Sequence, residues 1–203
     1  SVTIDVTDPV ASPVSIANED ANDANDGDVI TLTFTVSETL AADPTCAFTD
    51  SSTATMASAT VLDSGLDYTC TVTVADTDAT GTVSFSIGFT DVAGNSVTVT
   101  STTDSSSVDI DNVHPTLAIT EHVENTGSSA TNDATPEITF TTDEAGTITF
   151  SGCNINSVTS SASSGSNTID LDSDGAGAVL SDATYSNCVV TVTDIAGNAG
   201  SAT

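Results

Sequence analysis

Several short stretches of this chain alternate apolar residues with threonine, serine or glycine. Every second position is apolar in residues 30–36 and 83–89, namely Ile30, Leu32, Phe34 and Val36, then Val83, Phe85, Ile87 and Phe89. A period of two predicts strands with one buried and one polar face. The pattern returns at Ile138 and Phe140, at Ile148 and Phe150, and at Val190 and Val192. Helical patterns are scarce, so the chain is predicted to be all-β.

The predicted strands belong to two copies of one unit. Ile4-Asp5-Val6-Thr7-Asp8-Pro9 returns 106 residues later as Ile110-Asp111-Asn112-Val113-His114-Pro115, and residues 33–38 match residues 139–144 at the same offset. Each copy also has an Asp-Val/Ile-Ala-Gly-Asn turn, at 91–95 and at 194–198. We predict one domain at 1–110 and a second at 111–203, with residues 1–8 as an entry linker or a strand shared with a preceding module. About seven short strands in about 100 residues favour a two-sheet sandwich for each.

Charge restricts the partners of the chain. It contains no lysine or arginine and 29 acidic residues, which gives a formal net charge of −29. Nucleic acid is excluded as a partner because no cation is available to displace phosphate counterions. No apolar run is long enough to cross a bilayer, so membrane insertion is not expected. A chain this acidic needs external counterions, and bound calcium or high salt is implied.

Covalent cross-links within the chain can come from its four cysteines, two in each copy. Lysine isopeptide bonds are excluded because the chain has no lysine. The cysteines are not spaced as zinc ligands. We therefore predict one disulfide in each domain and an oxidising, extracellular setting.

Several motifs of both copies resemble those of a known protein family. The residues that carry the resemblance are Gly27-Asp28 before the strand ending at Glu38, then residues 81–87 and 91–95, and in the second copy residues 143–148, 185–188 and 194–198. They are similar to the immunoglobulin-like tandem repeats of large bacterial extracellular adhesins and surface filament proteins. The resemblance implies two tandem immunoglobulin-like β-sandwich domains, with a disulfide in each, at the cell surface.

The immunoglobulin-like topology implies how the cysteines pair. In the second copy it places Cys153 at the end of the third strand and Cys188 at the start of its antiparallel neighbour. In the first copy Cys46 begins the third strand and Cys70 begins a strand of the other sheet, so that bond would cross between the sheets. Loops of this size should contribute about 3 to 4 kcal/mol each on the chain-entropy model.

The same topology brings the entry linker and two turns to one end of each sandwich. In the first copy this gathers Asp5, Asp8, Glu38, Asp91 and Asn95. In the second copy the set is Asp111, Glu144, Asp194 and Asn198, with Asp143 nearby. Oxygen ligands from separate segments suit calcium, which we predict at both junctions. The alternative is that these residues only form turns through side chain to backbone hydrogen bonds.

The two copies differ after their last turn. The first copy continues through residues 96–110, whereas the second reaches residue 203 soon after Asn198. We expect the last strand of the second copy to be incomplete. Either the chain is part of a longer tandem array, or separate subunits join head to tail, with residues 1–5 of one completing the sheet of the next. The expected partners are therefore copies of itself or adjacent repeats.

Taken with the resemblance, these features predict a non-enzymatic extracellular structural module of a surface filament or giant adhesin stalk. One alternative is a ligand-binding adhesin tip or an accessory domain of a secreted glycan-active enzyme; the absence of tryptophan and the presence of only two tyrosines argue against it. Another is a surface-layer or halophilic wall protein, which shares the acidity. The sequence specifies no receptor or glycan.

Overall fold

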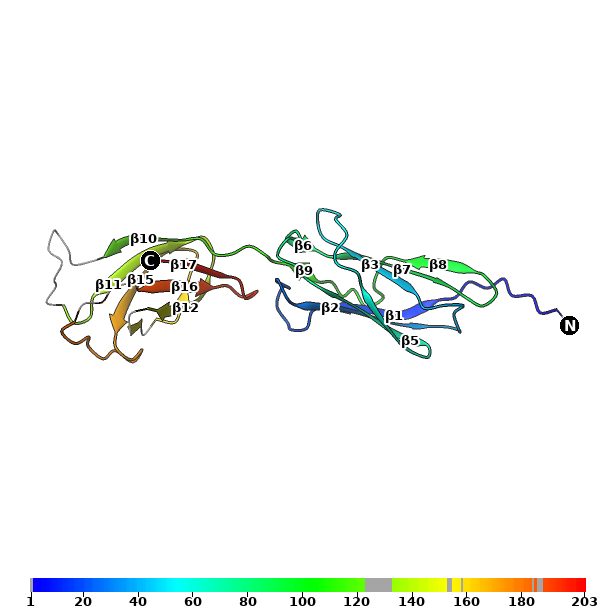
Figure 1. Cartoon of the computed structure of the whole chain (residues 1–203), viewed down its shortest axis with the longest axis horizontal. Coiled ribbons are helices and arrows are strands. Elements are labelled where there is room, and N and C mark those ends of the chain that lie inside the picture. The colour runs from blue at the N-terminus through cyan, green and yellow to red at the C-terminus, as the bar shows by residue number, and fades with distance from the viewer. Residues whose placement is uncertain (1, 123–132, 153–154, 158, 184, 186–187) are drawn as a thin grey trace. The chain divides into compact units, whose positions relative to one another are not determined.

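The chain forms two compact units built from β-strands. We describe it from a computed structural model of residues 1–203, in which residues 2–122, 133–152, 155–157, 159–183, 185 and 188–203 are described (Figure 1). The units are Ser1–Asn112 and Val113–Thr203, so the division falls two residues beyond the boundary predicted at 110. Every regular element among the described residues is a strand, and the all-β fold class is as predicted. This part of the chain contains no helix long and apolar enough to cross a membrane.

The first unit consists of two main antiparallel sheets. One has the order β1-β2-β5-β4, formed by Ala11–Ala17, Val29–Val36, Asp67–Thr73 and Thr60–Ser64. The other has the order β3-β7-β8, formed by Thr45–Thr49, Ser84–Thr90 and Ser96–Val99. A short pair joins β6 (Gly81–Thr82) to β9 (Asp109–Ile110). A four-stranded and a three-stranded sheet with these neighbours are the arrangement of immunoglobulin-like sandwiches.

The alternating residues form the core of the first unit. In β2 the apolar side chains of Ile30, Leu32, Phe34 and Val36 are all buried, while the threonines between them are not. The Phe34 ring stacks on Tyr68 of β5 with centroids 5.5 Å apart and on Phe89 of β7 at 6.5 Å. Since β2 and β7 belong to different sheets, these rings join the two layers.

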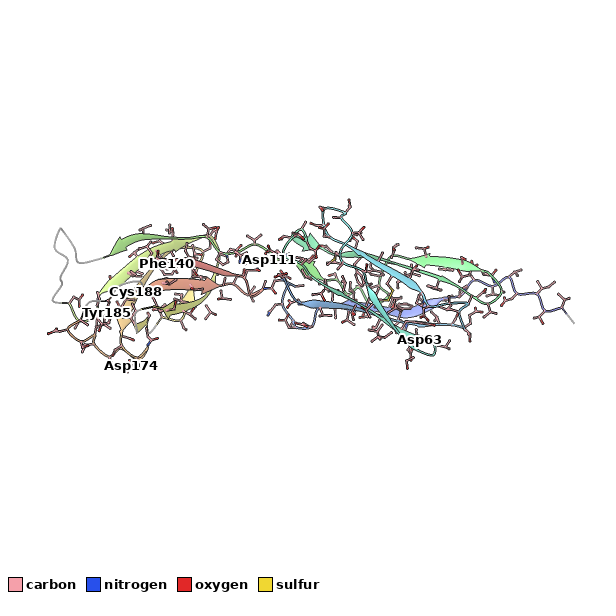
Figure 2. The ribbon with its side chains drawn as sticks, viewed as in Figure 1. Asp63, Asp111, Phe140, Asp174, Tyr185 and Cys188 are labelled. Carbon is pink, nitrogen blue, oxygen red and sulfur yellow. A yellow bond between two sulfur atoms is a disulfide. The ribbon has the colours of Figure 1, made fainter. Side chains whose placement is uncertain are left out.

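The second unit repeats the architecture. Its first sheet has the order β10-β11-β15-β13, formed by Leu117–His122, Glu137–Thr142, Gly165–Asp172 and Asn156–Ser157. Its second sheet has the order β14-β12-β16-β17, formed by Ser161–Ala162, Gly146–Ser151, Val189–Thr193 and Ala199–Ala202. Phe140, labelled in Figure 2, is fully buried and belongs to the core of this unit, together with Ile138, Ile169, Val190 and Val192. The sequence predicted an incomplete last strand in this second unit. The last strand, β17, has four residues, which is the length of β8, the strand at the same edge of the first unit.

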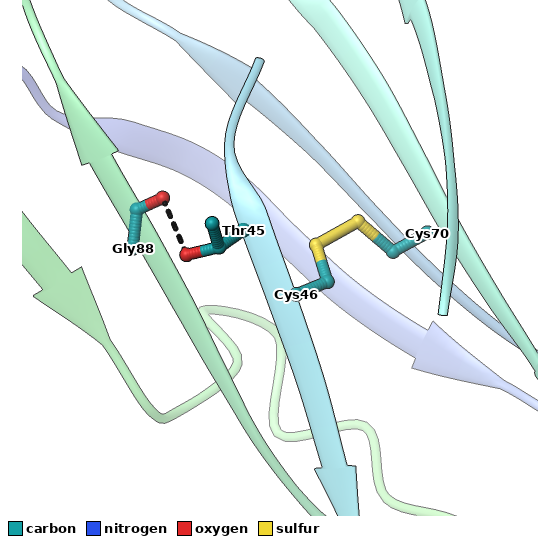
Figure 3. Close-up of a disulfide and its surroundings, with 4 residues drawn as sticks. All are labelled: Thr45, Cys46, Cys70 and Gly88. Carbon is teal, nitrogen blue, oxygen red and sulfur yellow. Dashed lines mark hydrogen bonds between the residues drawn. A yellow bond between two sulfur atoms is a disulfide. The ribbon is translucent and has the colours of Figure 1, made fainter. Parts of the chain in front are cut away.

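The first-copy disulfide joins the two sheets of its unit as predicted. Cys46 of β3 is bonded to Cys70 of β5 (Figure 3). On the other side of β3, the Thr45 hydroxyl donates to the carbonyl oxygen of Gly88 in β7 at 3.3 Å. In the second unit Cys188 is disulfide-bonded. Its predicted partner Cys153 lies outside the described residues, so that pairing stays a prediction.

Candidate cation site at the entry to the first unit

The segment before β1 is fastened to the turns at one end of the first sandwich. The backbone N–H of Val10 donates to the Ser37 hydroxyl at 2.9 Å, and the N–H of Ser37 donates to the Val10 carbonyl at 2.8 Å. Further back, the carbonyl of Thr7 accepts from the side-chain amide of Asn95 at 3.1 Å. The N–H of Thr7 in turn donates to Asp5 Oδ1 at 3.0 Å. This chain of hydrogen bonds places Asp5 beside the turns that follow β2 and β7.

Three carboxylates meet at this place. Asp5 comes from the entry segment, Glu38 from the turn after β2, and Asp91 from the end of β7. One carboxylate oxygen of each lies within 4.8 Å of the others. Asp5 is exposed, Glu38 is half-buried, and Asp91 is 1% exposed. Three of the five residues predicted for this site are therefore brought together.

The negative charges at the cluster repel one another. Burial raises the pKa of Glu38 above its usual value, and the neighbouring carboxylates of Asp5 and Asp91 raise it further. Burial also raises the pKa of Asp91, but hydrogen bonds from the side chain and backbone of Asn95 and from the backbone of Gly94 and Ala93 outweigh it, so that pKa is lowered. Asp91 thus stays ionised beside Glu38. Three hard oxygen ligands without a cationic side chain among them suit Ca²⁺.

Asp91 also shapes the turn that carries it. Its Oδ1 accepts from the N–H groups of Gly94 at 2.6 Å and Asn95 at 2.9 Å, while its Oδ2 accepts from the Asn95 side chain at 2.7 Å. Gly94 has φ of +103°, a left-handed conformation that glycine adopts without strain. The hydrogen bonds are those that the turn-forming alternative requires. In the first unit, turn formation and the carboxylate cluster therefore coexist at one residue.

Two other residues predicted for this site have different surroundings. Asp8 is exposed and is not part of the carboxylate cluster. Asn95 uses its side-chain nitrogen to join Thr7 and Asp91, so it acts as a hydrogen-bonded bridge between the entry segment and the turn.

The second predicted set is divided between the two units. Asp111 belongs to the first unit, where its N–H donates to the Ala24 carbonyl at 2.8 Å, while Glu144, Asp194 and Asn198 belong to the second. Asp194 repeats the turn of Asp91: its Oδ1 accepts from Gly197 at 2.7 Å and its Oδ2 from the Asn198 side chain at 3.0 Å. The Asp143 carboxylate accepts a hydrogen bond from the N–H of Thr116 at 2.7 Å. This contact holds the segment before β10 to the turn after β11, as the Ser37 hydroxyl holds the segment before β1 in the first unit.

The sequence interpretation missed several carboxylates that the structure places at key turns. Asp50 is buried and accepts from the backbone of Ser52, Ala54 and Ala79. Asp172 accepts from three N–H groups in its turn, those of Asp174, Gly175 and Gly177. An aspartate followed two or three residues later by serine or glycine is the available sequence signal for such turns. Asp63 and Asp174, by contrast, are exposed (Figure 2).

A surface hollow over the second sheet of the first unit lacks the features of a sugar site. It is lined by parts of β3, β7 and β8, and its lining includes Asp43, Thr45, Phe89 and Ser96. Phe89, the aromatic residue of this lining, is buried in the core. The hollow therefore offers no exposed ring on which a sugar could stack.

No protein-family model matches the chain, and no curated protein matches its sequence. Among solved structures, a DUF4785 family protein from Legionella pneumophila is similar over 90% of this chain and 52% of its own, with 10% identity and a TM-score of 0.40. A tetra-tandem repeat in the extending region of a large adhesion protein is similar over 96% of this chain and 48% of its own, with 17% identity and a TM-score of 0.37. The chain spans about half the length of each. At these scores the likeness is loose.

Proposed function

We propose that this chain is a non-enzymatic structural module of an extracellular protein, of the kind found in surface filaments or adhesin stalks. In this proposal, Ca²⁺ bound by Asp5, Glu38 and Asp91 locks the entry segment onto the first sandwich. The observation that carries the proposal is the meeting of these three carboxylates, from three separate segments, where the chain enters the unit.

The physical role of the ion follows from the contacts around it. Within the described part of the chain, hydrogen bonds hold Asp5 to the sandwich indirectly, through Thr7 and Asn95. A cation bound to all three carboxylates would connect Asp5 directly to the ends of β2 and β7. It would also offset the repulsion that, in addition to burial, raises the pKa of Glu38. Calcium sites in extracellular modules have Kd values of about 10⁻⁴ to 10⁻³ M. Such a site fills at extracellular calcium and stiffens a junction between modules.

Two further features support an extracellular structural role. The Cys46–Cys70 bond joins the two sheets, and structural disulfides persist in oxidising surroundings. The motifs recur in two sandwiches that share the order of their main strands, although the second sheet has an additional short strand, β14, in the second unit; this repetition suits a load-bearing protein.

A surface-layer or halophilic wall protein is the second candidate, and the net charge of −29 favours it. In that case many weakly held monovalent cations, and not one specific calcium ion, would offset the acidic repulsion. The two candidates differ in their response to calcium at constant ionic strength.

The test is equilibrium unfolding at one ionic strength with calcium, with magnesium, and with a chelator. If the Kd lies in the range above, 10 mM calcium should stabilise the first unit by about 1.4 to 2.7 kcal/mol. Hydrogen exchange of peptides from β2 and β7 assigns the effect to this unit. Glu38→Gln should lose the calcium response, whereas Asp8→Asn should keep it because Asp8 lies outside the cluster. Equal stability with calcium and chelator would overturn the calcium site. In a separate series with chelator and increasing sodium chloride, stabilisation by the salt alone would favour the wall protein.

A further inference from the structure

The first strand of the first unit lies beside a segment from much later in its sequence. The N–H of Thr103 donates to the Val14 carbonyl at 2.9 Å, and the Thr103 hydroxyl accepts from the N–H of Val14 at 2.9 Å. Two residues further along β1, the N–H of Ile16 donates to the Ser106 hydroxyl at 2.9 Å. Residue numbers rise in the same direction on both sides, so residues 103–106 run parallel to β1. They cover the edge of β1 that faces away from β2.

The parallel arrangement continues to the place where the chain leaves the first unit. Ile110 of β9 pairs in parallel with Ala24. The N–H of Ala24 donates to the Asp109 carbonyl at 2.8 Å, and the N–H of Asp111 donates to the Ala24 carbonyl at 2.8 Å. On its other side β9 pairs with β6, and the side chains of Val108 and Ile110 are 5% and 1% exposed. The strand at the exit is therefore held on both sides and by the core.

Tension along the chain would load these contacts in shear. It enters the first unit through the segment before β1 and leaves through the residues after β9, and these two places lie at opposite ends of the unit (Figure 1). Because β1 and residues 103–111 run parallel, pulling the two ends apart slides one segment along the other. Hydrogen bonds between strands lie across the direction of sliding, so they are strained together. A hairpin that is opened from its end, by contrast, loses its hydrogen bonds one at a time.

We propose that residues 103–111, together with β1 and Ala24, form a mechanical clamp that bears tension transmitted through the chain. The clamp gives a mechanical function to the structural module proposed above; the inference rests on that structural role but does not require the calcium site. Thr103 and Ser106 bond to β1 through their side-chain hydroxyls. These bonds can be removed by substitution without altering the backbone, which makes the clamp testable.

The Cys46–Cys70 bond lies outside the clamp and makes the first unit recognisable when it is stretched. It encloses residues 47–69 in a loop that tension can extend only after the bond has been reduced. The sequence separation is 24 and the Cα–Cα distance is 6.4 Å. Reduction should therefore lengthen the unfolding step of the first unit by roughly 70 to 80 Å at full extension. The step that grows by this amount is assigned to the first unit.

Single-molecule stretching of the 203-residue chain at constant force, held by tags at both ends in chelator, tests the clamp. Thr103→Val removes the hydroxyl that accepts from Val14 and should shorten the lifetime of the folded first unit under force roughly 3- to 10-fold. Thr103→Ser keeps a hydroxyl and should restore the lifetime to within a factor of about 2. The matched control is Asp63→Ala, which removes the acceptor of the Gly65 N–H inside the disulfide loop. Its lifetime should stay within a factor of about 2 of the wild type, because contacts that are intact when the clamp breaks do not change the unfolding rate.

Equilibrium unfolding of the same variants in denaturant separates the clamp from overall stability. Both Thr103→Val and Asp63→Ala should lower the free energy of unfolding, but only Thr103→Val should shorten the lifetime under force. Equal lifetimes of the wild type and Thr103→Val overturn the clamp. Equal shortening by Thr103→Val and Asp63→Ala also overturns it, because the effect then follows stability and not the path of the force. Unfolding that does not respond to calcium overturns the calcium site and leaves the clamp intact, since the lifetimes are measured in chelator.

Discussion

Asn95 and Thr7 are 88 residues apart in the sequence and are joined by a hydrogen bond of 3.1 Å from the Asn95 side-chain amide to the Thr7 carbonyl. The same amide group donates to Asp91 Oδ2 at 2.7 Å. Asn95 therefore holds the entry segment and the turn after β7 together, and it does so beside the carboxylate cluster. The position of Asp5 depends on this contact, because Asp5 is connected to the sandwich through Thr7.

Substitution Asn95→Ala should release the entry segment from the first unit. Both side-chain hydrogen bonds are lost, and the expected decrease in the free energy of unfolding is about 1 to 2 kcal/mol. Hydrogen exchange at Thr7 and Val10 should accelerate, while exchange in the second unit should not change. The control is Asn198→Ala, which removes the equivalent amide from the second unit and should leave Thr7 unaffected. Unchanged exchange at Thr7 in Asn95→Ala would contradict this account.

The raised pKa of Glu38 predicts an unusual pH dependence in the absence of calcium. Its proton is bound more tightly in the folded state than in the unfolded state, where the pKa is near 4.5. The unfolded state therefore binds fewer protons, and stability should fall as the pH rises from about 4.5 through the raised pKa of Glu38. The measurement is chemical denaturation across this range in chelator.

Glu38→Gln isolates this effect from the other carboxylates. The pKa values of Asp91 and Asp143 are lowered, so their contributions are present above pH 3.8 and are lost as the pH falls below it. The difference between the wild-type chain and Glu38→Gln should therefore grow above pH 4.5 and shrink when calcium is added. A pH-independent difference would mean that burial and the neighbouring carboxylates do not raise the pKa of Glu38.

The Cys46–Cys70 bond should account for a large part of the stability of the first unit. It closes a loop with a sequence separation of 24, for which the chain-entropy model gives about 3 to 4 kcal/mol. Replacing the pair by Cys46→Ala and Cys70→Val, which keeps an apolar side chain at the fully buried position, should lower the free energy of unfolding by about that amount. The second unit, which has its own bonded Cys188, should be unaffected. A loss below about 1 kcal/mol would show that the reduced unit is held mainly by its core.

Asp104 provides a further pH test, on the segment that precedes β9. The hydroxyl and then the backbone N–H of Ser106 lower the pKa of Asp104 to about 2. The Ser106 hydroxyl also accepts from the N–H of Ile16 in β1 at 2.9 Å, so this carboxylate orders an edge of the sheet. Its contribution to stability is present above pH 3.8 and is lost as the pH falls towards 2. In Ser106→Ala, the NMR titration of Asp104 should move up towards 3.8, and an unchanged midpoint would contradict the assignment.

Alternation and repetition made the strands predictable. The residues from Ile30 to Val36 alternate between the core and the polar face of β2, and the offset of 106 between the copies identified Phe140 as the counterpart of Phe34. The bond from Cys46 to Cys70 followed once the strand order was assumed. The strands and the disulfide could be predicted because they depend on the alternation of apolar and polar residues and on the order of the strands.

Individual turn residues were less predictable. Asp5, Glu38 and Asp91 were correctly placed together, but Asp8, three residues beyond Asp5, is exposed outside the cluster, because a few backbone angles in an entry segment decide which side chain faces the turns. The assignment of Asp111 to the second site missed that its backbone pairs with Ala24 as part of the first unit. Sequence equivalence gives the position of a residue in the repeat, but not the sandwich to which a linker residue belongs.

Two glycines with different surroundings allow a direct test of strand packing. A Cβ atom on Gly146 of β12 would lie 2.2 Å from the carbonyl oxygen of Thr193 in β16, whereas a Cβ on Gly88 of β7 would lie 2.9 Å from the Thr45 hydroxyl. Backbone in a paired sheet cannot move away without breaking its ladder, but a threonine hydroxyl can rotate. Gly146→Ala should therefore destabilise the second unit by about 2 to 3 kcal/mol, the upper part of the range for overpacking, while Gly88→Ala should cost less than about 1 kcal/mol in the first. Denaturation monitored by hydrogen exchange separates the two units, and a larger loss for Gly88→Ala would mean that the approach of β12 to β16 is looser than described.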